Sequence, residues 1–502
     1  MHHSPKTPRN SSFLTRLVYL YILSFPFFGF SFFNQGGRGL ARPDWIIGAL
    51  LLLVFGLKLA CKRLKVADSP ANKFVILYMY TGGLSIVNLF NASNAQLIGL
   101  ATKGLQLLMV TPIFFVISSL PIGKQEIRTI LRVWVFSGFA VSIHAIYQLF
   151  GQLFNLPFTS FQLTNPSISS GLQSARTLFG YTQPMSVFQE PSYMGAFLGP
   201  CLLLAVTMVL TNRAEEFFFE NKRLNWLLLI TITLAVLLSN SQAILGALLA
   251  TLAVVYERGL LKRRQLVKLS LLSVVVLLLA GLLLRMFGID FLSAFSLRTQ
   301  FLIVNILDPY NTIQVTSFAD RWQGLLIGLE IWIRNPILGV GLGNMGYHND
   351  ARLGTNNPWL QVMVEQGTLG WLALGMVFCT LWHRLRTVME EIDDLFWRPV
   401  IISMLLILFL TMIDGLFTFN WTHPLRVFTL AMANLVYIQA TAARRGSEPI
   451  RSKRRGRSFA PARWFSTLKS SFALGKRQAV NGKNAGNPTD KTSAPWRTEC
   501  TF

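Results

Sequence analysis

The sequence is poor in charged residues, and in acidic residues above all. Only 14% of its 502 residues are charged, and 22 Asp and Glu stand against 46 Lys and Arg. Because ordinary soluble domains carry about 25% charged residues, this composition excludes a soluble globular enzyme. Cysteine is scarce too, and its spacing indicates neither a disulfide framework nor a zinc site; the four residues are Cys61, Cys201, Cys379 and Cys500.

Long hydrophobic runs take the place of the missing charge. Hydrophobic residues make up 52% of the chain, and the mean hydropathy is +0.46. A helix needs roughly 20 apolar residues to cross a bilayer, and suitable runs, such as residues 266–284, recur about a dozen times along the chain. The alternating segments of about ten residues that build a membrane β-barrel are absent. We therefore predict an all-α, polytopic helical membrane protein.

The distribution of Lys and Arg predicts how the chain crosses the membrane. Cations collect in cytoplasmic loops, so two neighbouring basic clusters enclose an even number of spans. Clusters occur near Lys62, Arg128, Arg223, Arg264 and Arg384. They predict about twelve transmembrane helices with both termini in the cytoplasm. These spans are 17–33, 44–60, 73–90, 97–119, 130–150, 185–210, two short helices within 224–256 that meet near 239–242, then 266–288, 358–382, 399–419 and 424–440.

Three parts of the chain follow from this topology. Residues 1–16 form a cytoplasmic N-terminus, residues 17–441 the transmembrane domain, and residues 442–502 a basic, disordered cytoplasmic tail. The tail holds 14 Lys and Arg against 3 Asp and Glu and has too little apolar surface to fold. We expect it to contact anionic lipid headgroups rather than nucleic acid. The first apolar run lacks a convincing cleavage site, which favours a retained helix over a signal peptide.

Residues 289–357 form one long periplasmic loop between the ninth and tenth predicted spans. Loops of this length usually carry function. Within it, residues 317–334 predict a helix lying in the outer interface of the membrane. Its apolar stripe consists of Phe318, Trp322, Leu325, Leu326, Leu329, Trp332 and Ile333. Asp320, Gln323, Glu330 and Arg334 fall on the opposite face, and Arg321 borders the stripe.

The same loop contains a G-x-G-x-x-G pattern at Gly341, Gly343 and Gly346. A dinucleotide site would require a preceding buried strand within a βαβ unit, and none surrounds these glycines. They also face the outside, where nucleotide cofactors are not normally available. We interpret them as backbone geometry, a tight and close-packed turn against the membrane.

Two stretches resemble the O-antigen ligase/polymerase superfamily of bacterial envelope enzymes. "NPILGVGLGN" after an Arg-containing amphipathic helix, followed by "NNPWLQVMVEQGTLGW" at the start of a span, is similar to its central motif. "FQEPSYMGAFL", residues 188–198, is similar to the entry motif of its polysaccharide polymerases. The residues that match the central motif are Arg321, Pro336, Gly339, Gly341, Asn357, Leu360, Gln361, Glu365, Gly367 and Gly370.

The resemblance implies a multi-pass glycosyltransferase in the bacterial inner membrane. Such proteins take a polyprenyl-diphosphate-linked glycan as donor on the periplasmic face, without a metal, a cofactor or a sugar nucleotide. Ligases pass the glycan to a lipid-core sugar, and polymerases pass it to another lipid-linked repeat unit. Besides this glycan and membrane lipids, a flippase and a chain-length regulator are candidate partners.

Two departures from the ligase pattern favour a polymerase. Ligases carry His where this chain has Asn356, and Arg where the turn between the two short helices has Gln242. A ligase or a protein O-oligosaccharyltransferase of the same fold remains the alternative. A transporter or flippase is disfavoured, because transporters usually show internal repeats and we find none between the halves.

The expected chemistry needs a cation for the departing diphosphate. An Arg fork binds phosphate oxygens bidentately and stays charged. Arg321 is the first candidate, since it matches the family's Arg, and a snorkelling arginine is the alternative. The other outer arginines are Arg176, Arg298, Arg334 and Arg352.

The acceptor hydroxyl needs a base or a positioning group. His348 has a suitable pKa, and Glu190 is the competing carboxylate, unless it only caps the following helix. Glu365 needs a buried partner, which is either structural or catalytic. Asp320, Asn356 and Asn357 are candidates to orient sugar hydroxyls, although Asn357 equally suits a helix cap before Pro358. Asp414 and His423 frame the last outer turn, where His423 more simply marks the start of a span.

Overall fold

The computed structural model describes residues 13–32, 34–35, 38–39, 42–89, 93–164, 171–172, 176–178, 181–241, 248, 251, 263–307, 316–348, 357–416 and 421–447. The chain divides into two units, Met1–Ser447 and Glu448–Phe502. Every described residue belongs to the first unit. Most of the predicted tail, residues 448–502, and residues 1–12 of the predicted N-terminus therefore fall outside the described residues, whereas residues 13–16 begin α1 and residues 442–447 end α16.

The first unit is built almost entirely of helices, as predicted. Those in its first half are α1 (Phe13–Ser24), α2 (Pro43–Ala60), α3 (Pro70–Leu84), α4 (Asn94–Val110), α5 (Ile113–Ser118), α6 (Lys124–Leu153), α7 (Pro191–Leu210), α8 (Ala214–Phe217) and α9 (Lys222–Leu238). The later ones are α11 (Arg263–Met286), α12 (Phe291–Leu307), α13 (Thr316–Arg334), α14 (Pro358–Glu391), α15 (Trp397–Asp414) and α16 (Pro424–Ser447). Three short 3₁₀ helices are η1 (Phe25–Phe27), η2 (Ser85–Leu89) and η3 (Met345–Tyr347).

Seven segments in the described residues are long and apolar enough to cross a membrane, and two shorter helices are also apolar. The protein is thus a polytopic helical membrane protein, while the number of twelve spans stays a prediction. The predicted break near residue 239 coincides with the end of α9 at Leu238, with Ser239 as its C-cap. The predicted span that follows it lies largely outside the described residues.

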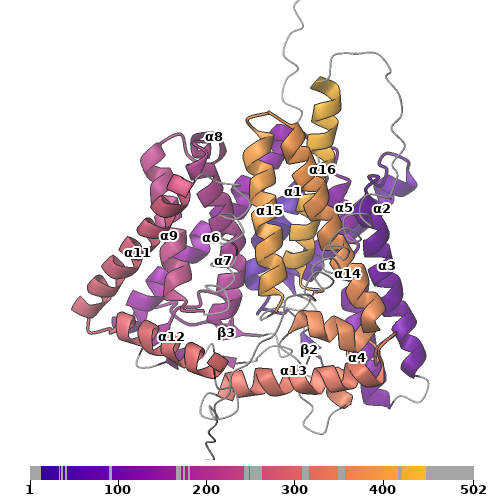
Figure 1. Ribbon diagram of the computed structural model, residues 1–502, viewed down its shortest axis with the longest axis horizontal. Helices are drawn as coiled ribbons and strands as arrows, with labels where there is room; N and C mark the ends of the chain where they lie inside the picture. The colour runs from indigo at the N-terminus through magenta and orange to yellow at the C-terminus, as the bar shows by residue number, and fades with distance from the viewer. Residues whose placement is uncertain are drawn as a thin grey trace, which may run out of the picture. The chain divides into compact units, whose positions relative to one another are not determined.

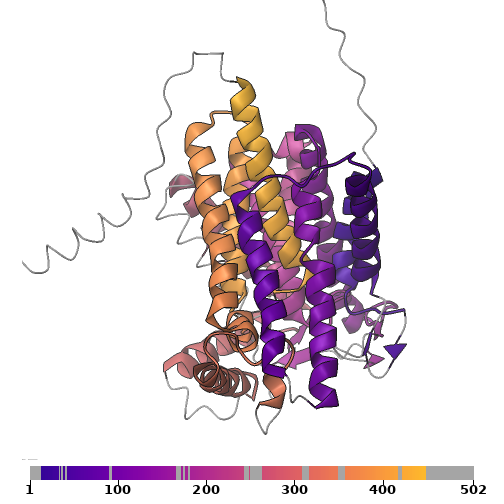
Figure 2. The ribbon, with the colours of Figure 1, turned by 90° about the vertical axis from the view of Figure 1, so that its right-hand side faces the viewer.

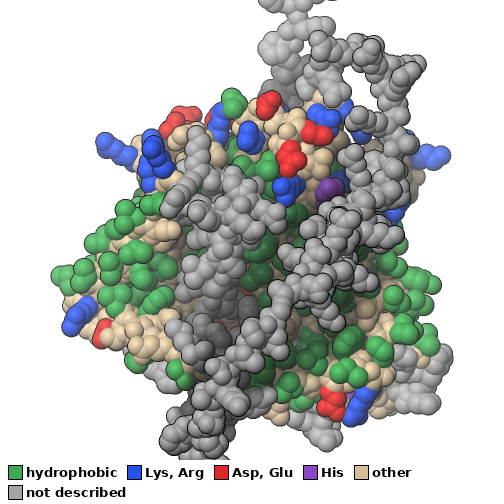
Figure 3. Space-filling model, in the orientation of Figure 1, with side chains coloured by type: hydrophobic (Ala, Val, Ile, Leu, Met, Phe, Trp, Pro, Cys, Tyr) green, Lys and Arg blue, Asp and Glu red, His purple; other side chains and the backbone are tan. Residues whose placement is uncertain are grey.

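Burial separates central from peripheral helices. In α7, 89% of the apolar window is buried inside the protein, whereas in α2 only 22% is. α7 therefore needs apolar residues on all sides, and it packs on α15, where Gly199 makes room for Leu410. Figure 1 and Figure 2 show the long helices running alongside one another. Exposed leucines on α2 and α11 are suited to face lipid, and Figure 3 shows hydrophobic side chains across both flanks.

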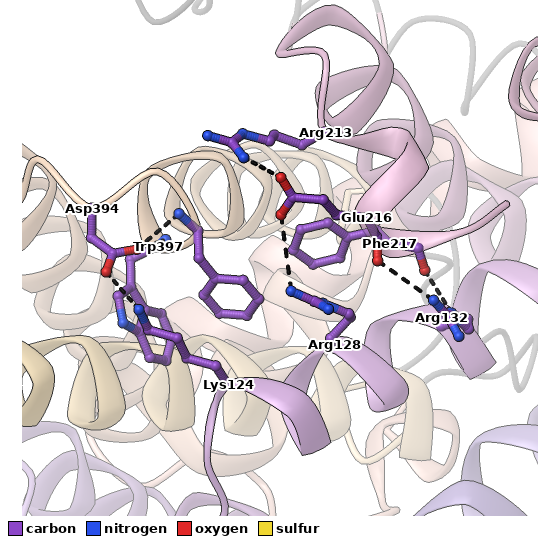
Figure 4. A network of polar contacts seen from close by, with 9 residues as sticks. Lys124, Arg128, Arg132, Arg213, Glu216, Phe217, Asp394 and Trp397 are labelled. Atoms are coloured by element: carbon purple, nitrogen blue, oxygen red, sulfur yellow. Dashed lines mark hydrogen bonds and ion pairs between the residues drawn. The ribbon is translucent and has the colours of Figure 1, made fainter. Parts of the chain in front are cut away.

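A polar network joins three segments that the charge pattern assigns to the cytoplasmic side (Figure 4). Lys124 of α6 lies 2.6 Å from Asp394 in the loop between α14 and α15. Arg132 of α6 donates to the carbonyl oxygen of Phe217 in α8 at 2.7 Å, and Glu216 pairs with Arg213 and Arg128. Their meeting at one end of the helices agrees with the predicted pairing of basic loops.

The opposite end carries elements that the sequence did not predict. The helix expected at 317–334 is present as α13, but a second helix, α12, precedes it in the same loop. Both run across the lower ends of the long helices in Figure 1. Three two-stranded antiparallel hairpins also occur: β1 (Asn34–Gln35) with β2 (Arg38–Gly39), β3 (Gln162–Leu163) with β4 (Gly171–Leu172), and β5 (Arg176–Leu178) with β6 (Tyr181–Gln183). Strands of two or three residues are too short for an alternating pattern to reveal.

Candidate functional site

At the end of the molecule that the charge pattern assigns to the periplasm, the central feature is a break in α14 at Gly367, where φ is 70° and ψ is −172°. A break deprives the preceding carbonyls of their helical N–H partners. Residues 335–348, here called the glycine loop, supply N–H groups in their place. The N–H of Val340 donates to the carbonyl oxygen of Val364 at 2.8 Å, and that of Gly341 to Glu365 at 3.1 Å. After the break, the N–H of Thr368 donates to the carbonyl oxygen of Pro336 at 2.8 Å. The loop and the broken helix thus complete each other's backbone hydrogen bonding.

Only glycine permits this close approach. Gly339 has φ +69°, and a Cβ there would lie 2.6 Å from the backbone nitrogen of Gly367. Gly343 has φ +73°, and a Cβ there would lie 2.6 Å from the carbonyl oxygen of Gly99 in α4. Positive φ and tight backbone contact both disfavour any side chain. This geometry agrees with the interpretation of the glycines as a close-packed turn.

α13 covers this junction with a face slightly different from the predicted one. Its buried positions are Gly324, Gly328 and Ile331, and Gly328 makes room for Leu360 at the start of α14. The indole N–H of Trp332 donates to the hydroxyl of Thr368 at 3.1 Å. Leu326 and Ile333, expected within the apolar stripe, are instead 44% and 67% exposed. The packed face is centred on small residues because they let α13 approach α14 closely. The sequence prediction missed this face because it placed only large apolar side chains on the stripe.

His348 follows η3 at the end of the glycine loop. Its side chain is exposed, yet partial burial of the ring lowers the pKa of His348 below the ordinary histidine value. A neutral imidazole has a nitrogen that can accept a proton. The loop therefore presents a group with the properties of a base at the end predicted to face the periplasm.

Glu365 lies inside the same junction and is 6% exposed. Its carboxylate accepts a hydrogen bond from the side-chain amide of Gln361 at 3.0 Å and another from the N–H of Gly343. Lys103 of α4 is close enough to stabilise the charge electrostatically. These contacts tie α14 to the glycine loop, which fits the structural alternative for Glu365.

Asn357 is the N-cap of α14. Its side chain accepts from the N–H of Leu360 at 3.1 Å, and Pro358 occupies the first helical position. The capping alternative is thus confirmed. Glu190 occupies the N-cap position of α7, but its carboxylate accepts from the Ser192 hydroxyl at 3.1 Å and makes no side-chain cap bond to the backbone.

A pair of tryptophans anchors the beginning of α14. Trp359 donates from its indole nitrogen to the carbonyl oxygen of Met412 in α15 at 2.9 Å. Its ring meets that of Trp421 at 4.5 Å, and the guanidinium of Arg426 lies 4.5 Å from the Trp421 ring. The outer half of α14 is consequently held at its start by these rings and at its end by the glycine loop.

A buried charge cluster beside this anchor was not predicted as a whole. Asp414 pairs with Arg426 at 3.1 Å, and Arg42 forms a two-point pair with Asp44. His423 is 9% exposed and interacts electrostatically with Arg42 and Arg426. The sequence singled out Asp414 and His423. It gave no sign that the two arginines contact them, because single arginines near span ends resemble snorkelling residues.

Several candidate side chains lie outside the described residues. The backbones of Asp320 and Arg321 lie in α13, that of Arg298 in α12 and that of Arg176 in β5, but their side chains lie outside the described residues, as do Asn356 and Arg352 altogether. Arg334 ends α13, is exposed, and pairs with Glu330 at 2.5 Å one turn earlier. Such an exposed pair is weak, so the Arg334 guanidinium can leave Glu330 and bind another anion.

Residues 227–375 match the family model described as O-antigen ligase (Wzy_C), and a search of curated proteins found no match. The matched region contains α13, the glycine loop and the broken part of α14, so it coincides with the junction described above. The resemblance seen in the sequence is confirmed: over residues 227–375 this multi-pass membrane protein carries a domain of the O-antigen ligase/polymerase superfamily.

Proposed function

We propose that the protein polymerises oligosaccharide repeat units linked to polyprenyl diphosphate. The reaction takes place on the periplasmic face of the bacterial inner membrane, with both termini in the cytoplasm. The growing chain is transferred from its lipid diphosphate to a hydroxyl of the next lipid-linked unit. The product is an exopolysaccharide or an O-antigen.

The observation that carries this proposal is the held outer half of α14, with His348 exposed on the loop that completes it. Transfer between two large lipid-linked substrates depends on positioning, and a segment fixed at both ends provides a rigid platform for it. The lowered pKa of His348 leaves a neutral imidazole that can take the proton of the acceptor hydroxyl.

The remaining roles follow from the chemistry. Arg321 binds the departing diphosphate, assisted by Arg334 and Arg176, and supplies the positive charge without a metal ion. Asp320 and Asn356 orient sugar hydroxyls. Glu190 is the second candidate for the base.

An O-antigen ligase is the second candidate function, and the description of the matching family favours it. Polymerisation is preferred because Asn356 and Gln242 replace two polar side chains of the ligase pattern. The two activities differ only in the acceptor, so the reaction product distinguishes them.

Complementation of a polymer-deficient host tests the proposal, with glycan length read on a gel. We expect long ladders with the wild-type protein and single repeat units with Arg321→Ala or His348→Ala. Arg386→Ala is the matched control, because Arg386 forms an exposed pair one turn apart at the other end of α14, and it should give wild-type ladders. Repeats that lengthen in the host without the protein, but reach their final carrier only with it, would identify a ligase instead.

A further inference from the structure

Lys103 is the only charged residue in α4, a helix of otherwise apolar and neutral polar residues. A charged side chain within a membrane-spanning segment is costly, and such residues usually mark a functional site. Lys103 belongs neither to the matched region nor to any motif that the sequence revealed. Its position therefore calls for an explanation from its surroundings.

The stem of Lys103 packs against the glycine loop. A Cβ on Gly343 would lie 2.8 Å from its Cγ atom. Its ammonium group acts on the carboxylate of Glu365, but that carboxylate already accepts from Gln361 and from the N–H of Gly343. Among the described residues, Lys103 forms neither a hydrogen bond nor an ion pair. Lys103 and Glu365 thus interact electrostatically but do not form an ion pair.

Lys103 faces the protein and yet stays half-buried. Gly99, Lys103 and Gln106 share one side of α4, where Gln106 accepts a hydrogen bond from Thr422 at 3.5 Å. The exposed residues Ile98, Leu105 and Leu108 occupy the opposite side. Lys103 is therefore a partly exposed cation on the side of α4 that contacts the glycine loop and Thr422.

We propose that Lys103 binds the diphosphate of the lipid-linked substrate, which rests on the function proposed above. An ammonium group that forms no ion pair among the described residues can take an anion as a further partner, and lysine binds phosphate as a point charge. Its contact with Gly343 places this charge on the loop that carries His348. Lys103 thus holds the diphosphate beside the group that activates the acceptor.

The first experiment measures binding of sugar-free polyprenyl diphosphate to the purified full-length protein in detergent. We expect Lys103→Gln to weaken binding by about 10- to 100-fold, the loss of one charged hydrogen bond, and Lys103→Arg to restore most of it. Lys58→Gln is the matched control, because Lys58 is also half-buried but lies in the last turn of α2, near the predicted cytoplasmic end. It should bind like the wild type.

A second measurement uses the wild-type protein and needs no variant to fold. Lysine acylation is followed by mass spectrometry with and without polyprenyl diphosphate, which should protect Lys103 and leave Lys58 unchanged. Phosphatidylglycerol at the same concentration should protect much less. Equal protection by this phospholipid would overturn the assignment to the substrate, since any headgroup phosphate would then suffice.

The outcomes separate this inference from the proposed function. If the wild type binds polyprenyl diphosphate but Lys103 is neither protected nor needed, Lys103 has no such role and the proposed function stands. If the wild-type protein does not bind polyprenyl diphosphate, the proposed function fails and the inference fails with it.

Discussion

At the residue scale, the site depends on the different surroundings of a few polar side chains. Glu365 is buried and bonded to Gln361 and to the glycine loop, whereas His348 on the same loop is exposed and its side chain has no hydrogen bond to the part of the chain that the structure describes. A buried group with satisfied hydrogen bonds stabilises structure, whereas an exposed titratable group can exchange protons with a substrate. The two residues therefore suit different tasks.

The rate of polymerisation should depend on the protonation of His348. Partial burial lowers its pKa, so the neutral form persists to a lower pH than for an ordinary histidine. We expect the rate to fall only as pH drops through this lowered pKa, below about 6.5. Initial rates measured from pH 5 to pH 8 test this. The residual rate of His348→Gln should no longer decline at acidic pH, and a decline unchanged in that variant would assign the proton to another group.

At the element scale, the break in α14 divides one long helix into an outer and an inner segment. The outer segment begins at Asn357 and is held by Trp359 against α15. Gly367 makes the break possible, because its φ of +70° is unfavourable for other residues and its backbone meets that of Ile337. The geometry of the whole element thus rests on one position.

Gly367→Ala should be strongly destabilising, whereas Gly375→Ala in the same helix should not. A Cβ on Gly367 would overlap backbone atoms of Ile337 and Leu338, while one on Gly375 meets nothing within 4 Å. We expect a loss of about 2 kcal/mol or more at Gly367. At Gly375 we expect a change within about 1 kcal/mol, favourable in sign. Thermal unfolding in detergent compares them, and equal melting temperatures would contradict the role given to the break.

At the scale of the whole molecule, the two ends of the helices have different chemistry. One end carries the network of Lys124, Arg128 and Asp394, and the other carries the glycine loop with α12 and α13. Basic loops stay in the cytoplasm, so the candidate site should face the periplasm. This orientation is open to a direct test.

Cysteine labelling should place the two ends on opposite sides of the membrane. The native Cys61, exposed after α2, lies at the predicted cytoplasmic end, and Ser293→Cys on α12 would report the other end. With the remaining cysteines replaced, a membrane-impermeant maleimide should label position 293 in cells with a permeable outer membrane. Cys61 should react only after the inner membrane is opened. The reverse pattern would invert the topology and refute a periplasmic site.

The sequence predicted the helical membrane fold, the end of a helix near residue 239 and the helix at α13, and it allowed the cap at Asn357 as one of two interpretations. These features depend on hydrophobicity and on contacts within a few residues, because lipid requires each segment to satisfy its own backbone. The proposed roles of Arg321, Asp320, Arg176 and Asn356 remain predictions, since they concern side chains outside the described residues.

Only the tertiary structure showed that residues 336–341 complete the break at Gly367, that Lys103 lies beside Glu365, and that Arg42, Asp414, His423 and Arg426 form one cluster. Each joins parts of the chain that the sequence separates by a loop or by several helices. Composition and periodicity by themselves thus determined that this protein crosses the membrane and where most helices run. Which polar groups meet was decided by helix packing, because in a membrane protein those contacts follow from how neighbouring helices and loops fit together rather than from local sequence.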